Sequence, residues 1–372
     1  MNSQQETASY EPSTKAQLET FRRYRGRLEA LYDSKVRVSA LNAKEGNKVS
    51  QGFRISLSEA PMTDFSRAII TDWDDTIENY SQRKPKYYTA LYGLVLETYK
   101  GKMSESEFQA ICLEINRHAR ALNPQKHHPA QYSPLLEMVA ESRLFELLSK
   151  EDVAEHEKSS LQRLLADPKG QARAFLQSQV LFKFGGYLTD DEDKEKGKPY
   201  FVEKQHQSLA TTFDTPSPIV NEQVWNLFVT EMTKPALSPQ DVENIDLQDS
   251  DYWVISTFGG IEFQLEKVLQ SLEHLKKQGK RMPNEIIITT RGRKSPFIHE
   301  LVAEGDHMEW WFLDDSGRQF EELSEDPNLH PVRARRPGTK RYDDPSIEGV
   351  PEFDMDGPLS KVFELQSNTM GQ

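Results

Sequence analysis

Four short apolar runs, each closed by polar residues, stand out in the hydrophobic pattern of the chain. Each has the length of a buried strand, and they cover residues 66–71, 252–255, 285–289 and 308–313. Between the last three runs, residues 261–279 and 295–303 carry apolar side chains at helical spacing. Strands that alternate with helices predict parallel pairing through right-handed crossovers. The pattern therefore predicts an α/β fold with a doubly wound parallel sheet.

A long segment with a different pattern separates the first strand run from the second. Apolar positions recur there at helical spacing, in segments 87–99, 104–122, 134–148, 151–165, 171–184 and 220–232. Ser104 and Glu107 form a capping-box pattern at the start of one of them. We therefore predict a helical insertion at 84–245, within an α/β core built from 61–83 and 246–325.

The two ends of the chain are more polar. Residues 1–60 are expected to form a polar segment with a docking helix at 16–31, and alternating fragments between 35 and 57 indicate short strands or an irregular lead-in. The charge run 190–198 is expected to be an exposed loop. Residues 326–372 are polar and rich in proline, so we expect a flexible C-terminal tail. This tail contains a basic cluster, made of Arg333, Arg335, Arg336, Lys340 and Arg341.

Composition narrows the classes of function. Among 372 residues, 46 Lys and Arg stand against 59 Asp and Glu, and the formal net charge of −13 argues against a nucleic-acid surface over the whole protein. The single cysteine, Cys112, excludes an internal disulfide and a four-cysteine zinc site. It also lacks the Cys-x5-Arg spacing of thiol-based phosphatases, because position 118 is His.

Targeting signals are also missing from the sequence pattern. No apolar run approaches the ~18 residues of a membrane span, and the first residues lack the basic and apolar regions of a signal peptide. We therefore expect a cytoplasmic protein without a membrane span, with unconventional secretion left open. Nothing in the pattern specifies an oligomeric state.

Carboxylates and hydroxyls follow the ends of three of the predicted strands. In chain order they are Asp72, Asp74, Thr76, Ser256, Thr257, Asp314 and Asp315. In open α/β sheets ligands bind beyond the carboxyl ends of parallel strands, so we expect these side chains to share one site. Carboxylates can hold a hard divalent cation and can attack a phosphate. Lys294, at the start of a predicted helix, would balance their negative charge.

In this order the residues resemble the four signature motifs of the haloacid dehalogenase (HAD) superfamily, whose members are mostly Mg²⁺-dependent aspartyl-phosphate phosphatases. The resemblance covers roughly residues 64–80 and 250–320 and implies a HAD-like core. It implies that Asp72 is the nucleophile and that Asp74 is the general acid and base. It also implies Mg²⁺ held by Asp72, Asp314 and the backbone carbonyl of Asp74.

The resemblance gives supporting roles to the other residues of the set. Ser256 would donate to a phosphoryl oxygen, and Lys294 would balance the charge of the nucleophile and the phosphoryl group. Thr76 would fix the turn after the strand through its hydroxyl, and Asp315 would bind the ion through water or orient its neighbour. In the family an insertion after the first motif is a cap over the site. The chain departs from the commonest phosphatase pattern at Asp75, where that pattern has glycine.

Some assignments have competitors in the sequence. Thr257 could replace Ser256 as the hydroxyl donor, and the run 286–290 could be the second motif under a shifted alignment. That alignment leaves only four or five residues before Lys294, too few for a helix and a strand. The lysine itself has other candidates, namely Arg291, Arg293 and Lys280.

Other readings of the acidic motifs fit less well. A calcium loop starting at Asp72 would need glycine at the sixth position and glutamate at the twelfth, which are Ile77 and Arg83 here. In a receiver domain the acidic pair precedes the phosphorylated aspartate, the reverse of the order found here. His127 and His128 lack companions at ligand spacing and are expected in a solvated loop.

The sequence therefore predicts a Mg²⁺-dependent phosphomonoester phosphatase. Its expected substrate is a phosphorylated metabolite or a phosphoprotein, including phosphotyrosine. The alternative is a catalytically inactive HAD-like binding or scaffold protein that uses its helical region and tails as partner surfaces.

Overall fold

The structure is a computed structural model that describes residues 14–45, 48–99, 103–122, 129–150, 152–181, 220–320, 323, 326–339 and 341–365. The chain divides into two compact units. One consists of Met1–Arg23 with Leu94–Trp225, and the other of Tyr24–Gly93 with Asn226–Gln372. The expected polar segment before residue 14, the charge run 190–198, and the pair His127 and His128 lie outside the described residues.

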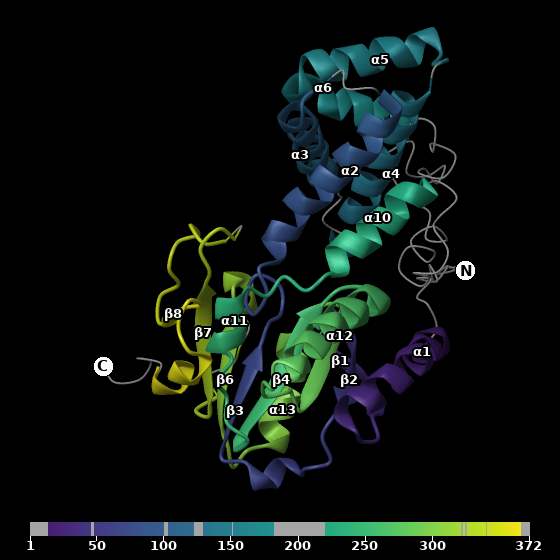
Figure 1. The fold of residues 1–372 in the computed structure, drawn as a ribbon. Helices are drawn as coiled ribbons and strands as arrows, with labels where there is room; N and C mark the ends of the chain where they lie inside the picture. The colour runs from purple at the N-terminus through teal and green to yellow at the C-terminus, as the bar shows by residue number, and fades with distance from the viewer. Residues whose placement is uncertain are drawn as a thin grey trace, which may run out of the picture. The chain divides into compact units, whose positions relative to one another are not determined.

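The first unit is helical (Figure 1). Its helices are α3 (Glu105–Leu122), α4 (Pro129–Ser149), α5 (Glu155–Ala166) and α6 (Pro168–Phe175), continued by the π-helical segment Leu176–Leu181. Asp167 caps α6 by accepting a hydrogen bond from Gly170 N, at 3.0 Å, and proline follows at the first helical turn. Helix α3 packs against α4 and α6. Three helices, α1 (Thr14–Tyr32), α2 (Arg83–Tyr99) and α10 (Glu222–Thr233), run across the boundaries of the units.

The second unit is an α/β domain built on one eight-stranded sheet (Figure 1). The strand order is β1-β2-β5-β4-β3-β6-β7-β8, with antiparallel pairing of β2 to β1 and to β5 and parallel pairing elsewhere. The strands are β1 (Arg37–Glu45), β2 (Lys48–Ser56), β3 (Arg67–Thr71), β4 (Asp251–Phe258), β5 (Glu285–Arg291), β6 (Glu309–Asp314), β7 (Leu329–Arg335) and β8 (Glu352–Asp354). The predicted α/β class is confirmed, and its four predicted strands are β3 to β6.

Two helices cover the central strands on opposite faces of the sheet. Helix α12 (Ile261–Lys277) connects β4 to β5 in one direction, and α13 (Ser295–Glu304) connects β5 to β6 in the other. Right-handed crossovers in opposite directions place their helices on opposite faces, which makes the sheet doubly wound. Ile70, Val254 and Phe312 pack with Phe297 and other apolar residues of α13 in one core cluster.

The two ends of the chain differ from expectation because both extend the sheet. The region expected to form short strands or an irregular lead-in does form strands, and β1 and β2 make a hairpin that pairs with β5. The expected flexible tail instead contributes β7 and β8, with Val332, Ala334 and Phe353 buried. Arginines between the apolar positions obscured this strand in the sequence. Arg333 is itself buried, because its guanidinium donates to the carbonyls of Pro345 and Asp344.

The remaining elements are short. Helix α11 (Pro239–Asn244) is capped reciprocally by Ser238 and Asp241, which form a capping box. The described chain also has 3₁₀ turns at Met62–Asp64, Tyr80–Gln82, Gly317–Gln319 and Leu359–Glu364. Every helix among the described residues is too short or too polar to span a membrane.

Candidate active site

Three of the predicted residues emerge together because of the strand register. Thr71, at the end of β3, pairs with a residue of β4 on one side and of β6 on the other. Parallel strands in register bring the next residue of each strand to the same edge of the sheet. These next residues are Ser256, Asp72 and Asp314, and the Asp72 backbone N–H donates to Leu313 O at 2.8 Å.

Lys294 joins two of these side chains. It stands immediately before α13, and its Nζ lies 2.5 Å from Asp72 Oδ1 and 2.8 Å from Asp314 Oδ2. The connection from β5 passes through Gly292, whose φ of 80° and whose close approach to Val49 O exclude a larger residue. The lysine side chain is only 3% exposed, so its ammonium group is committed to these two carboxylates.

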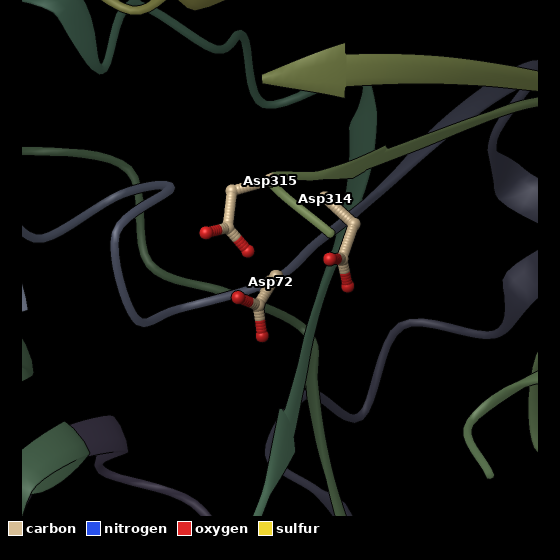
Figure 2. Close-up of side chains that lie close together, drawn as sticks. All are labelled: Asp72, Asp314 and Asp315. Carbon is tan, nitrogen blue, oxygen red and sulfur yellow. The ribbon is translucent and has the colours of Figure 1, made fainter. Parts of the chain in front are cut away.

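Asp72, Asp314 and Asp315 form a buried carboxylate cluster. One oxygen from each lies within 4.8 Å of the others. Figure 2 shows the three carboxylates gathered at the ends of neighbouring strands. Asp315 also faces Arg341, with 3.5 Å between Arg341 Nη1 and Asp315 Oδ1. This is an oxygen-rich site of the kind that hard divalent cations bind.

The electrostatics of the cluster are unbalanced, because three buried carboxylates face one buried lysine, Lys294, and the more exposed Arg341. Burial raises the pKa of Asp72 well above its usual range, and Asp314 and Asp315 add to the shift against the opposing effect of Lys294. Burial likewise raises the pKa of Asp315 to about 7, with the charge of Asp314 contributing. Burial opposes the charge of Lys294, but Asp314 and Asp72 outweigh it and raise the pKa of the lysine. A cation would relieve this excess negative charge.

A divalent cation bound by this cluster, with Mg²⁺ as the test ion, should stabilise the protein more at pH about 8 than at about 5, because bound metal requires deprotonated carboxylates. A carboxyl whose pKa is higher in the folded state binds its proton more tightly there. The metal-free protein should therefore lose stability as pH rises from the ordinary aspartate pKa, about 4, toward the value of about 7 at Asp315. Thermal unfolding with Mg²⁺ and with EDTA at both pH values measures the difference. Asp315→Asn, which cannot titrate, should reduce it, whereas an equal Mg²⁺ shift at both pH values would contradict the assignment.

The turn after β3 contains a strained residue at the position where the sequence departs from the family pattern. Asp75 has a φ of 58°, in the left-handed region that glycine adopts most easily. Aspartate tolerates this region better than most residues, and here its carboxylate accepts hydrogen bonds from Ser81 N and Ser81 Oγ, both at 2.7 Å. These hydrogen bonds of the Asp75 side chain stabilise a backbone conformation that glycine would adopt without them.

The predicted role of the Thr76 hydroxyl is wrong in this structure. Thr76 Oγ1 is buried and has no hydrogen-bond partner among the described atoms. The turn is fixed instead by Arg336, which donates to Thr76 O at 2.9 and 2.6 Å and to Ile77 O at 2.8 Å, and pairs with Asp241 at 2.5 Å. Sequence reasoning placed Arg336 in a basic cluster but gave it no role, since backbone carbonyl partners leave no signal in the sequence.

Asp74 contacts a lysine that sequence reasoning missed. Both of its carboxylate oxygens lie 2.5 Å from Lys267 Nζ, and its side chain is 27% exposed. Lys267 belongs to the helical pattern of 261–279, where a lysine is ordinarily solvated. Its neighbours on the same helix face, Gln264 and Ser271, are also polar and buried, and this was the available signal.

The competing assignments are separated by their contacts. Ser256 Oγ is buried without a hydrogen-bond partner among the described atoms, whereas Thr257 Oγ1 donates to Gln264 Oε1 at 2.8 Å. The run 286–290 belongs to β5, which β4 separates from β3, and this disfavours the shifted alignment. Lys280 donates to Glu243 O, while Lys294 contacts Asp72. These contacts favour Ser256 and Lys294.

Comparisons with known proteins give little further information. No protein-family model matches the chain, and no curated protein matches its sequence. One similar solved structure is the 2-haloacid dehalogenase from Pseudomonas syringae pv. Tomato DC3000, with 10% identity and a TM-score of 0.34 over 81% of this chain and 99% of that one.

Proposed function

We propose that this protein is a Mg²⁺-dependent phosphomonoester phosphatase that forms an aspartyl-phosphate on Asp72. One observation carries the proposal. The Asp72 carboxylate stands at the carboxyl edge of a parallel sheet, beside the carboxylates of Asp314 and Asp315, and it shares the ammonium group of Lys294 with Asp314. A nucleophile, a fixed cation and a metal-binding carboxylate set are the parts that phosphoryl transfer through an aspartate requires.

The donor set suits Mg²⁺. Asp72 and Asp314 would bind the ion, with the backbone carbonyl of Asp74, while Asp315 would bind through water or orient its neighbour. The bound ion would offset the repulsion between the nucleophile and a phosphate dianion. The excess of three buried carboxylates over their two basic partners, Lys294 and the more exposed Arg341, supports a cation here rather than a site that works without one.

The side chains divide the chemistry between them. Asp72 attacks phosphorus as the bond to the leaving oxygen breaks, and Asp74 protonates that oxygen. Asp74 then takes a proton from the water that hydrolyses the aspartyl-phosphate, which releases phosphate and regenerates Asp72. Lys294 balances the charge that builds up on the phosphoryl group. Ser256 supplies a hydroxyl that has no competing partner among the described atoms.

The helical insertion is proposed to act as a cap that selects a phosphorylated metabolite or a phosphoprotein. The chain leaves the α/β unit after the turn that carries Asp74 and returns to it before β4. The two ends of the insertion are linked by hydrogen bonds inside that unit. Arg83 Nη1 donates to Met232 O at 2.8 Å, and the Glu78 carboxylate accepts from Ala236 N at 3.3 Å. The two ends of the insertion are therefore held together, and the first of them is close in sequence to the proposed acid.

Hydrolysis of an aryl phosphate tests the proposed activity directly. We expect turnover with Mg²⁺, loss of turnover in EDTA, and inhibition by Ca²⁺, because the larger and looser coordination of Ca²⁺ misplaces the nucleophile. Turnover that is unchanged in EDTA would contradict metal assistance. Absence of hydrolysis across aryl phosphates, phosphorylated metabolites and phosphopeptides would instead favour the binding or scaffold alternative.

A further inference from the structure

We propose that Lys267 is a positioning residue that fixes the carboxylate of Asp74 for its two proton transfers. The inference rests on the proposed phosphatase function and adds a residue that the sequence motifs do not include. Lys267 lies in the middle of α12, far in sequence from Asp74. Its side chain is 0% exposed, and its Nζ lies 2.5 Å from both Asp74 oxygens.

The pairing of Lys267 is specific to Asp74. A second buried carboxylate, Glu78, lies in the same region, but it has partners of its own. Glu78 pairs with Arg83, accepts from Ser271 Oγ, and accepts from the backbone of Ala236. Within the part of the chain that the structure describes, both hydrogen bonds of the Lys267 ammonium go to Asp74.

Burying the lysine ammonium group costs free energy, so packing alone does not explain why a lysine occupies this helix position. Moving an ammonium group out of water is strongly unfavourable, and an apolar side chain at this helix position would avoid that cost. The rings of Tyr80 and Phe263, 5.1 and 5.5 Å from Nζ, recover part of it through cation–π contact. The carboxylate of Asp74 adds most of the remaining compensation and the charge of Glu78 adds a smaller part. Among the described residues only Asp74 forms hydrogen bonds with the ammonium group, so the lysine is matched to that residue.

Lys267 completes a set of contacts that fix Asp74. The backbone beyond Asp74 is already held, because Asp75 binds Ser81 and Arg336 binds the carbonyls of the next two residues. Without Lys267, the Asp74 side chain, which is 27% exposed, would keep its rotational freedom. A two-oxygen contact with one ammonium group removes that freedom. Proton transfer to a leaving oxygen, and later from water, depends on such fixed geometry.

Lys267→Met removes the ammonium group and keeps the length and apolar stem of the side chain. With an aryl phosphate, whose leaving group departs without a proton, Asp72 should still be phosphorylated. Hydrolysis of the aspartyl-phosphate should be about 10-fold slower or more. The variant should therefore accumulate phosphoenzyme at steady state and lose kcat and KM together, with kcat/KM for the aryl phosphate little changed. With an alkyl phosphate, phosphorylation itself should also slow. Lys267→Arg should recover part of the rate, because it restores a cation.

Lys276→Met is the matched control, because Lys276 is on the same helix and its ammonium donates to Leu31 O and Asp33 instead. It should leave the phosphoenzyme level and the ratio of alkyl to aryl rates unchanged. If Lys267→Met lowers both rates by the same factor without phosphoenzyme accumulation, Lys267 is only structural and the inference is overturned.

A measurement without turnover separates this inference from the proposed function. Thermal unfolding of Lys267→Met, Asp74→Asn and the double variant forms a cycle, and we expect the double variant to lose less Tm than the sum of the two single losses. Additive losses would overturn the pairing. If the cycle shows coupling while the wild-type protein hydrolyses no phosphoester, the proposed function and the catalytic role of Lys267 are overturned, but the pairing of Lys267 with Asp74 stands.

Discussion

Asp72→Asn should abolish phosphoester hydrolysis without unfolding the protein. Asparagine keeps the size of the side chain but cannot attack phosphorus, so the rate should fall by at least about 10³-fold, or about 4 kcal/mol in activation free energy. Burial and the neighbouring carboxylates raise the pKa of Asp72, which means that its charge is unfavourable in the folded state. In EDTA the variant should therefore unfold at an equal or higher temperature than the wild type.

The controls for this variant separate the nucleophile from general charge effects. Asp249→Asn removes an equally charged but fully exposed side chain and should leave the rate unchanged. Asp74→Asn should be nearly as inactive as Asp72→Asn, yet it should retain phosphoenzyme formation from a good leaving group. Substantial steady-state turnover in Asp72→Asn would remove the basis of the proposed mechanism.

Lys294→Met should have the second-largest effect, because it leaves Asp72 and Asp314 buried without their lysine. Breaking a buried ion pair typically costs about 3–5 kcal/mol of stability. Loss of the fixed cation should also slow turnover by about 10²-fold or more. Denaturant unfolding with and without Mg²⁺ should show that the ion restores part of the lost stability, since it supplies positive charge to the same carboxylates.

Lys280→Met provides the comparison for Lys294→Met. Lys280 was a competing candidate in the sequence, but its ammonium group donates to the backbone carbonyl of Glu243. Its loss should change neither turnover nor the effect of Mg²⁺ on stability. If Lys294→Met behaves like Lys280→Met, the charge balance inferred for the carboxylate cluster is wrong.

The central strands, and the gathering of Asp72 and Asp314 at one edge of the sheet, were predictable because their signals are local. Each apolar run is nearly continuous, as expected for a strand covered on both faces, and each ends in residues whose chemistry is recognisable. Parallel pairing then requires Asp72 and Asp314 to emerge at one edge. The spacing between Ser256 and Lys294 allowed a helix and a strand, and α12 and β5 occupy it.

The remaining features depend on partners that are distant in sequence. Arginines between its apolar positions hide strand β7 in the sequence pattern, and carbonyls of the following loop accept hydrogen bonds from the two terminal nitrogens of the buried Arg333. Arg336 likewise binds carbonyls some 260 positions earlier in the chain, and such contacts carry no residue pattern. Lys267 has the ordinary spacing of a solvated helix residue, and only the fold brings Asp74 to it.

The covalent state of Asp72 tests the central claim most directly. The wild-type protein should be mixed with Mg²⁺ and an aryl phosphate, quenched in acid during turnover, digested, and examined by mass spectrometry. We predict a phosphoryl group on the peptide that contains Asp72, located on that carboxylate, and its absence in Asp72→Asn and in samples with EDTA. Rapid turnover with no phosphoryl group on this peptide, or with one on another residue, would contradict the account.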